Sequence, residues 1–244
     1  MPQERKDRID RAGKVAVVIP TFNEAESIAA VVAELPRDIV GRVIVADGGS
    51  GDGTAERARA AGAEAITVGR GYGLACLAGA AAAADADIIV FMDGDGADDP
   101  AAIAALVEPL RAGACDFVIA SRARGSREPG SMAWHQLLAG HVAGFLTKLL
   151  YGLRYTDMCA FRAIRRDTLL NLGMREMSYG WNLEMQMRVA RARLRVRELP
   201  VGYRRRIGGQ SKVAGSLRGS LQAGLKIIAT FARVALEPVR RRAS

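Results

Sequence analysis

Acidic side chains follow three apolar segments of the sequence, close to the point where each segment ends. Asp93 and Asp95 flank one glycine directly after the run IIVFM, Asp47 follows VIVA, and Glu24 comes shortly after VVIP. Mg²⁺ and Mn²⁺ take oxygen ligands and are commonly held by one or two carboxylates together with substrate phosphates. Asp93 and Asp95 therefore favour a cation bound to a diphosphate, although an Asp-Gly pair is equally good turn chemistry.

A glycine-rich loop, residues 47–54, carries a second group of polar side chains. Asp47 stands at the tip of its apolar segment, placed to accept a hydrogen bond from a ligand such as a base N–H, since a buried polar group needs a partner. Asp52 and Thr54 are better explained by the turn into the next helix and its cap. Arg70, before a Gly-Tyr-Gly turn, is a further candidate for contact with a nucleotide.

The elements that must position these side chains follow from the hydrophobic pattern. Short β-branched runs alternate with alanine-rich helical stretches, which is typical of βαβ units around a parallel sheet. Ligands of such sheets bind at the carboxyl ends of the strands. We expect an α/β fold with a mainly parallel, Rossmann-like sheet flanked by helices, in a single domain. The predicted strands are residues 15–19, 43–46, 65–68, 88–92 and 117–120, and the helices between them are residues 24–35, 54–61, 74–84 and 100–111.

The second half of the chain has a more varied pattern. Asp98, Asp99 and Pro100 predict the start of the last helix of the first half, because carboxylates and a proline favour a helix N-terminus. Beyond it we predict a Gly/Arg-rich loop at 122–130, an amphipathic stretch at 132–150, strands near 159–164 and 194–199, a helix at 181–191, a basic loop at 203–212 and an amphipathic helix from about 217 to 236.

The net charge of +9 is concentrated at the C-terminal end. Residues 188–244 hold 15 Lys and Arg against 2 Asp and Glu. Such a segment could meet phosphates, an anionic membrane or nucleic acid, and a solvated basic surface is an equally good explanation. Three widely spaced cysteines predict neither a disulfide framework nor a metal motif. With no secretory signal and no confident transmembrane segment, we expect a cytoplasmic protein.

Seven short motifs, in this order, resemble glycosyltransferase family 2. They most resemble its dolichyl- and polyprenyl-phosphate sugar transferase branch, over residues from about 14 to about 212. The resemblance implies a GT-A fold, a nucleotide-diphosphate sugar donor with GDP or UDP, and Mg²⁺ or Mn²⁺. The motifs are VVIPTFNEAESI, VADGGSGDGT, FMDGDGADDP, ASRARG, TDMCAFRAIRRDTL, GWNLEMQMR and ELPVGYRRRIGGQSK.

The resemblance also implies roles for individual residues. Asp47 matches the aspartate that reads the base, and Asp93 and Asp95 match the pair that meets ribose, diphosphate and metal. Two further sets match positions that contact the nucleotide and positions that hold phosphates of donor or acceptor. They are Pro20, Thr21, Asn23 and Glu24 for the nucleotide, and Ser121, Arg122, Arg206, Ser211 and Lys212 for the phosphates.

The sequence departs from this branch in two places. Ala97 stands where the branch has a glutamine that helps to hold metal, so coordination is expected to rely on the two aspartates and water. The branch's C-terminal membrane spans are replaced by the amphipathic stretch around 217–236. This stretch predicts either a peripheral contact with the inner face of the membrane or a helix that covers the core. The side chains expected on its apolar side are Leu225, Ile228, Phe231 and Leu236.

The expected reaction is an inverting sugar transfer to a phosphorylated acceptor, which could be a polyprenyl phosphate. A phosphate oxygen is already anionic and needs no protein base. For a hydroxyl acceptor, Glu184 and Asp157 are the candidate general bases. Glu184 could equally form a surface ion pair with Arg188 at i+4.

Two alternatives remain open at the level of the sequence: a sugar-1-phosphate nucleotidyltransferase, and a non-catalytic basic module that binds membrane or nucleic acid. Under the leading interpretation no nucleic-acid partner is expected. The predicted division of the chain is a charged arm at 1–13, a GT-A domain at 14–212 and a basic amphipathic helix at 213–244.

Overall fold

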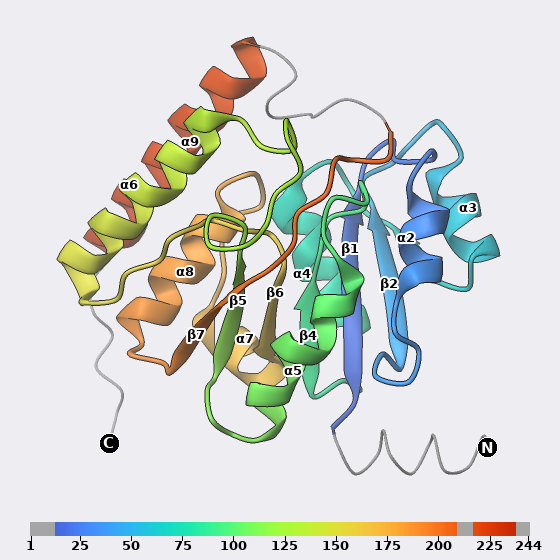
Figure 1. The fold of residues 1–244 in the computed structure, drawn as a ribbon, viewed down its shortest axis with the longest axis horizontal. Coiled ribbons are helices and arrows are strands. Elements are labelled where there is room, and N and C mark those ends of the chain that lie inside the picture. Colours follow the sequence, from blue (N-terminus) through green and yellow to red (C-terminus); the bar gives the residue numbers. More distant parts are fainter. Residues whose placement is uncertain (1–12, 209–216, 238–244) are drawn as a thin grey trace.

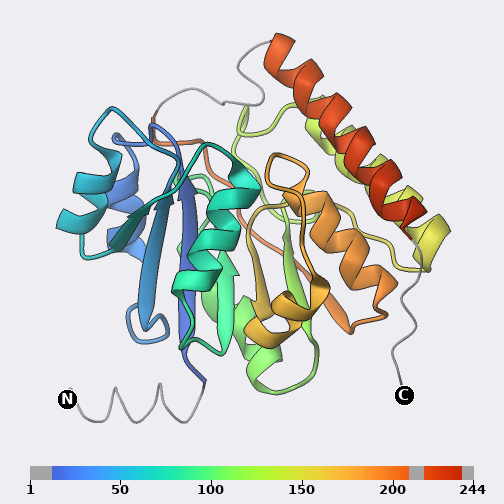
Figure 2. The ribbon, with the colours of Figure 1, turned by 180° about the vertical axis from the view of Figure 1, so that it is seen from behind.

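Seven strands form a single sheet in the order β3-β2-β1-β4-β6-β5-β7. The structure is a computed structural model and describes residues 13–208 and 217–237, with side chains of the last helix described from residue 224 onward. Helix α5 lies over one face of the sheet (Figure 1), and α4 and α8 lie over the other (Figure 2). The α/β fold with a mainly parallel sheet, predicted from the hydrophobic pattern, is confirmed.

The strands agree with the predicted segments to within a few residues. Strands β3, β2, β1 and β4 are mutually parallel, β7 is parallel to β5, and β6 runs antiparallel between β4 and β5. The strands are β1 Val15–Thr21, β2 Arg42–Asp47, β3 Glu64–Thr67, β4 Ile88–Phe91, β5 Phe117–Ser121, β6 Arg162–Arg165 and β7 Val196–Pro200.

Most of the helices also lie where the pattern predicted them. The α2 helix begins at Ile28 instead of residue 24, because residues 24–27 form a turn in which the Glu24 carbonyl accepts from the N–H groups of Ser27 and Ile28. The α7 helix was not predicted. The helices are α2 Ile28–Glu34, α3 Thr54–Ala60, α4 Tyr72–Ala82, the 3-10 turn η1 Pro100–Ala102, α5 Ile103–Arg111, α6 Trp134–Tyr151, α7 Arg166–Leu172, α8 Trp181–Arg191 and α9 Leu217–Leu236.

The predicted strand near 159–164 is shorter in the structure and begins only at Arg162. The Arg162 guanidinium donates to the carbonyls of Cys159 and Ala160, so these groups bond to a side chain instead of to a neighbouring strand. This side chain, fully buried, also donates to the Asn182 carbonyl. Arg162 therefore fixes the chain that enters β6 against the start of α8.

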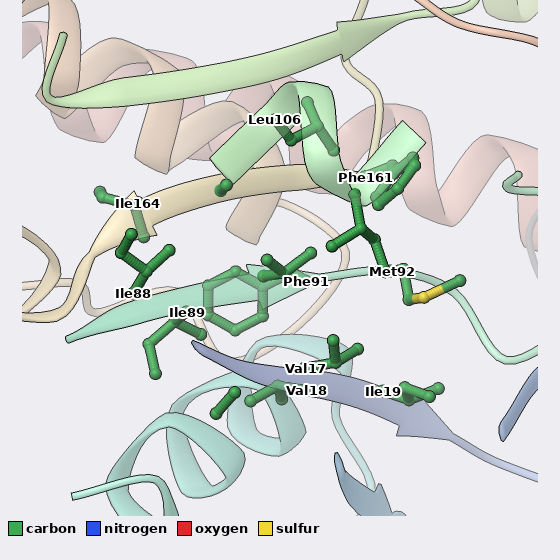
Figure 3. Close-up of a cluster of buried hydrophobic side chains, with 14 of the residues drawn as sticks. Val17, Val18, Ile19, Ile88, Ile89, Phe91, Met92, Leu106, Phe161 and Ile164 are labelled. Atoms are coloured by element: carbon green, nitrogen blue, oxygen red, sulfur yellow. The ribbon is translucent and has the colours of Figure 1, made fainter. Parts of the chain in front are cut away.

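The core lies on both faces of the central strands. Every residue of β1 is buried, as expected for a parallel strand covered by helices on both sides. Figure 3 shows side chains of β1 and β4 packed with Leu106 of α5 and with Phe161 and Ile164 around β6. This packing fixes the carboxyl ends of β1 and β4 relative to each other.

The α4 helix lies unusually close to the sheet because it is rich in alanine and glycine. A Cβ placed on Gly79 would lie 2.4 Å from Val18 Cγ1 of β1. A Cβ on Gly73 would lie 2.1 Å from the Glu176 carbonyl oxygen, so the loop before α8 lies against the first turn of α4. Small side chains thus bring α4 and this loop to the ends of the strands.

The C-terminal helix α9 packs on α8 through a small separate core. Ala143 of α6, Leu183 and Met187 of α8, and Val234 of α9 are buried together, and Phe231 packs against them. The sequence placed Phe231 on the same side as Leu225, Ile228 and Leu236; this was wrong, because those three side chains are exposed.

No helix among the described residues is long and apolar enough to cross a bilayer. The predicted boundary between residues 212 and 213 falls in the gap between the described ranges, and the arm at 1–13 lies almost entirely before them. The division of the chain into three parts therefore stays a prediction.

The approach of α4 to β1 predicts a size limit at Gly79. Replacing Gly79 with Ala should lower the free energy of unfolding by about 1–3 kcal/mol, the usual cost of overpacking a well-filled core. Urea unfolding followed by circular dichroism measures this change. The matched control is Gly224→Ala in α9, where a Cβ meets nothing within 4 Å; this change should be neutral or stabilise by up to about 1 kcal/mol. Equal stability of the two variants would contradict the close packing of α4.

Candidate functional site

A cavity of about 710 Å³ opens at the carboxyl ends of β1, β2 and β4. Its walls also include the start of α4, the first turn of α8 and one residue of α9, Ile227. This volume lies within the usual range for small-molecule sites. The predicted site residues that line the cavity are Pro20, Thr21, Glu24, Arg70, Asp93, Asp95 and Arg206.

The loop after β4 brings Asp93 and Asp95 into this cavity. Asp93 Oδ1 accepts a hydrogen bond of 3.2 Å from the Tyr72 hydroxyl, and Asp95 Oδ1 accepts one of 2.9 Å from the backbone N–H of Ala97. Between them, Gly94 packs against β1, where a Cβ would lie 2.8 Å from Thr21 Cγ2. The glycine therefore lets the loop turn tightly across the end of β1 and present both carboxylates on the same side.

A third carboxylate, Asp98, lies behind this pair. Only 3% of Asp98 is exposed, and it accepts a hydrogen bond of 3.1 Å from the backbone N–H of Asp93. Burial and the neighbouring charge of Asp95 raise the pKa of Asp93 to about 6. Burial, with the charges of Asp93 and Asp95, raises the pKa of Asp98 to about 8. Burial and neighbouring carboxylates therefore disfavour the ionised forms of Asp93 and Asp98.

The sequence analysis counted Asp98 only as part of a helix start. The helix prediction itself was right for Asp99, whose Oδ1 accepts from the N–H of Ala101 at the beginning of η1. The spacing of three aspartates in D-x-D-x-x-D was the signal for Asp98. It was missed because a carboxylate two residues before a helical proline has a sufficient local explanation.

Arg206 brings positive charge to the two acidic strand ends. Its Nη2 lies 3.0 Å from Asp95 Oδ2 and 3.6 Å from Glu24 Oε1. The backbone around it is fixed to the same loop, because Ile207 N–H donates to the Asp95 carbonyl and Arg204 N–H to the Ala97 carbonyl. Arg206 thus lies where an anionic ligand would replace these carboxylates as the partner of its guanidinium. Ser211 and Lys212, predicted to hold phosphates with it, lie outside the described residues.

Asp47 lies at the end of β2 but does not line the cavity. It is 2% exposed, and its carboxylate accepts from the N–H groups of Gly49 and Ser50 and from the hydroxyls of Ser50 and Thr21. It fixes the loop 47–54 to the end of β1. Its predicted contact with a base stays a prediction. Asp52 has the turn role expected of it, since its carboxylate accepts from the Thr54 N–H. The expected cap was wrong, because the N-cap of α3 is Gly53 and no side chain caps it.

Asn23 follows β1, and Arg70 follows β3. Asn23 adopts a left-handed backbone conformation with φ 53°, and its side-chain oxygen accepts from the Gly51 N–H, so it joins the end of β1 to the loop after β2. The Arg70 guanidinium lies 4.3 Å from the centre of the Phe22 ring. Phe22 and Arg70 both line the cavity.

Ser121, Arg122 and Asp157 come together outside the cavity lining. The Arg122 guanidinium forms two hydrogen bonds, of 2.8 and 2.9 Å, with the carboxylate of Asp157. Burial alone would raise the pKa of Asp157, but these bonds outweigh it and hold the pKa below its ordinary value. Ser121 is buried and hydrogen-bonds Thr156. The roles predicted for these residues stay predictions, and their observed contacts hold the end of β5 against the loop before β6.

Glu184, the other candidate base, also lies outside the cavity lining. It is fully buried and accepts from the backbone N–H groups of Arg175 and Glu176 and from the side chains of Arg188 and Arg233. The alternative that Glu184 pairs with Arg188 is confirmed at 2.9 Å, although the pair is buried and not on the surface. Burial would raise the pKa of Glu184, but its donors together hold the pKa below its ordinary value.

The sequence analysis missed several residues of the cavity wall. Tyr72, from the Gly-Tyr-Gly turn beside Arg70, donates to Asp93. Asn182 of α8 and Ile227 of α9 reach the cavity only through the packing of their helices. The turn was a usable signal for Tyr72, whereas nothing local marks Asn182 or Ile227.

The donor set in the cavity fits a hard divalent cation. Asp93 and Asp95 supply carboxylate oxygens, and a cation beside them would relieve the repulsion that raises the pKa of Asp93. Among the described residues, no three His, Cys, Asp or Glu side chains form a metal-binding group by themselves. Two carboxylates are the usual protein share for Mg²⁺, which keeps waters and takes substrate phosphates as its other ligands.

Comparisons with known proteins agree with this geometry. Residues 16–173 match glycosyl transferase family 2. An uncharacterized glycosyltransferase of Mycobacterium tuberculosis is 39% identical over 212 residues, which cover 86% of this chain and 94% of that protein. The undecaprenyl-phosphate mannosyltransferase of Micrococcus luteus is 32% identical over 139 residues, covering 54% of this chain and 55% of that one.

Among solved structures, glucosyl-3-phosphoglycerate synthase from Mycobacterium tuberculosis in complex with Mn²⁺, UDP-glucose and phosphoglyceric acid has a similar fold. The TM-score is 0.74 at 22% identity, with 98% of this chain and 85% of that chain covered. The sheet order and the position of the cavity therefore define a GT-A glycosyltransferase fold.

The chain belongs to glycosyl transferase family 2. It is a glycosyltransferase, as the resemblance of its motifs implied, and the two alternatives left open by the sequence are set aside.

The buried carboxylates predict how stability depends on pH. The pKa values of Asp93 and Asp98 are raised in the folded state, so the folded protein binds more protons than the unfolded chain from about pH 4 to pH 8. Stability should fall as the pH rises through this window. Asp98→Asn keeps an acceptor for the Asp93 N–H but cannot ionise, so its Tm at pH 9 should exceed that of the wild type by at least about 2–4 °C.

Thermal unfolding in metal-free buffer at pH 5, 7 and 9 measures this effect. Asp167→Asn, on the exposed start of α7, is the matched control and should leave the pH dependence unchanged. A variant at Asp98 that follows the wild type at all three pH values would show that folding does not raise the pKa of this carboxyl group.

Proposed function

We propose that this glycosyltransferase moves a sugar from a nucleotide-diphosphate sugar to a phosphorylated acceptor, with Mg²⁺ or Mn²⁺ held by Asp93 and Asp95. The favoured acceptor is a polyprenyl phosphate. The observation that carries the proposal is the arrangement of the cavity, where two carboxylates on the loop after β4 lie opposite the guanidinium of Arg206. This pairing of acidic and basic groups suits a cation and a diphosphate bound together.

The metal would be held by Asp93 and Asp95 with phosphate oxygens and water, since Ala97 offers no ligand side chain. When bound, such a cation neutralises charge that develops on the leaving diphosphate. Arg206 can exchange its contact with Asp95 for a phosphate oxygen, because a guanidinium binds carboxylate and phosphate with similar geometry. Tyr72 holds Asp93 in place through its hydroxyl.

The donor base would lie near the end of β1, where Phe22 and Arg70 line the cavity. The Arg70 guanidinium carbon lies 4.3 Å from the centre of the Phe22 ring, and both groups can stack on a base. Structural neighbours were crystallised with Mn²⁺ and UDP-glucose, which supports a nucleotide sugar and a divalent cation. Both GDP and UDP are candidates for the nucleotide of the donor, and nucleotide binding distinguishes them.

The contacts of the two candidate general bases support a phosphorylated acceptor. The carboxylates of Glu184 and Asp157 are engaged by arginine side chains outside the cavity lining. A phosphate oxygen can attack the sugar C1 directly, forming the new C1–O bond as the bond to the diphosphate breaks, with inversion and without a protein base. Relatives named undecaprenyl-phosphate mannosyltransferase and polyprenol monophosphomannose synthase favour a lipid phosphate.

The metal site predicts a nucleotide affinity that depends on both the cation and Asp95. Calorimetric titration of GDP and of UDP, with and without Mn²⁺, should give metal-dependent binding of one of them. Asp95→Asn should weaken that binding at least about tenfold, equivalent to about 1.4 kcal/mol. Asp85→Asn is the control, because Asp85 pairs with Arg42 outside the cavity lining and its loss should leave binding unchanged. Binding of neither nucleotide at millimolar concentration would overturn the proposal.

The acceptor class is tested by product formation. Sugars carried on the nucleotide that binds serve as donors. Transfer to undecaprenyl phosphate should be detected by mass spectrometry. Transfer to undecaprenol should be absent, because the alcohol would require a general base. Equal transfer to the alcohol would contradict a phosphorylated acceptor. Transfer to 3-phosphoglycerate alone would retain the phosphorylated acceptor and reject the lipid.

A further inference from the structure

Helix α6 presents a continuous row of apolar side chains to solvent. Its members recur at i, i+4, i+8, i+11 and i+15, the spacing of one helix face. The opposite side, formed by Gly140, Ala143, Gly144 and Thr147, is buried against the rest of the protein. The exposed row consists of Trp134 at 74%, Leu138 at 54%, Val142 at 48%, Phe145 at 56% and Leu149 at 73%.

Helix α9 also exposes apolar side chains. Leu225, Ile228 and Leu236 are 59%, 67% and 83% exposed, while Thr230 and Val234 on the other side are buried. Both helices pack on α8 through one shared cluster and lie side by side along the same edge of the molecule (Figures 1 and 2). We call the exposed apolar side chains of α6 and α9 together the outer face.

The charged side chains within α6 and α9 are of one sign. Neither residues 134–151 nor residues 217–236 contain an aspartate or glutamate, and both segments contain basic residues. Lys148 is exposed beside the row on α6, and the Lys226 side chain is 50% exposed on α9. Helices that combine exposed apolar side chains with cations of their own match the surface of an anionic bilayer. The apolar side chains enter the acyl boundary there, and the cations meet the phosphates.

We propose that the outer face docks this protein on the surface of an anionic membrane. A second copy of the chain is a poorer occupant, because a symmetric contact through this face would bring together helices that carry only positive charge. Trp134, at the N-terminal end of α6, has the amphipathic ring that is enriched at membrane interfaces. Docking places α6 and α9 in the plane of the headgroups.

The outer face is directly linked to the cavity through α9. Ile227 lines the cavity, and the next residue, Ile228, belongs to the outer face, since successive residues of a helix point in different directions. The cavity wall and the docking surface are thus adjacent sides of one helix. Under the proposed function, on which this step rests, the phosphate of a polyprenyl acceptor enters the cavity while its chain stays in the bilayer.

Vesicle binding tests the docking directly. The full chain should sediment with vesicles of phosphatidylglycerol and phosphatidylcholine and much less with vesicles of phosphatidylcholine alone. The double variant Phe145→Gln, Leu149→Gln should bind at least about tenfold more weakly. Leu170→Gln on α7 is the matched control, since Leu170 is also apolar and 53% exposed but lies outside the outer face; it should bind as the wild type does.

Tryptophan fluorescence gives a local readout of the same event. The chain has two tryptophans, of which Trp134 is exposed and Trp181 is fully buried. Anionic vesicles should shift the emission to shorter wavelength, and Trp134→Phe should abolish the shift. A shift that persists in this variant would overturn docking through α6.

The outcomes separate this inference from the proposed function. Nucleotide binding without vesicles should be the same in the double variant and the wild type. A wild type that binds nucleotide and metal but not anionic vesicles overturns the docking alone. A double variant that changes the mass measured by light scattering, with vesicle binding unchanged, would identify the face as a contact between copies and also overturn it.

Discussion

Repulsion among carboxylates at the end of β4 is the constraint on which the site depends. Asp93, Asp95 and Asp98 are gathered within six residues, and burial leaves little water to screen them. Groups from distant parts of the chain offset this repulsion. Arg206 arrives from the loop after β7, and Tyr72 donates from the start of α4. Because like charges at close range oppose one another, this cluster of carboxylates favours a cation beside it.

The rest of the fold keeps this unfavourable cluster in place. The buried strands β1 and β4 hold their carboxyl ends in register, and Gly79 and Gly73 let α4 and the loop before α8 come close to them. Farther out, the ion pairs of Glu184 and Asp157 join α8 to α9 and β5 to the loop before β6. Two buried carboxylates that look catalytic in the sequence therefore stabilise the frame around the cavity.

The sequence predicted features that depend on short segments and missed contacts between residues far apart in the chain. The strands, most helices and the position of Asp93 and Asp95 at the cavity were predicted correctly, because hydrophobic periodicity and strand ends can be recognised in short segments. Glu184 could not be placed in the same way, since its partner Arg233 is 49 residues away. The exposed row on α6 was read only as amphipathic, because the sequence does not tell which side of a helix the core covers.

The antiparallel strand β6 has a consequence for how the chain folds. In the sheet of the described residues, it joins β5 and β7 to the four strands of the first half, because it lies between β4 and β5. Until residues 162–165 have been synthesised, the apolar strand β4 has an open edge that can pair with other chains. Late closure of this kind raises contact order and slows folding. During translation β4, which is followed by the loop with Asp93 and Asp95, is thus completed well before the rest of the sheet.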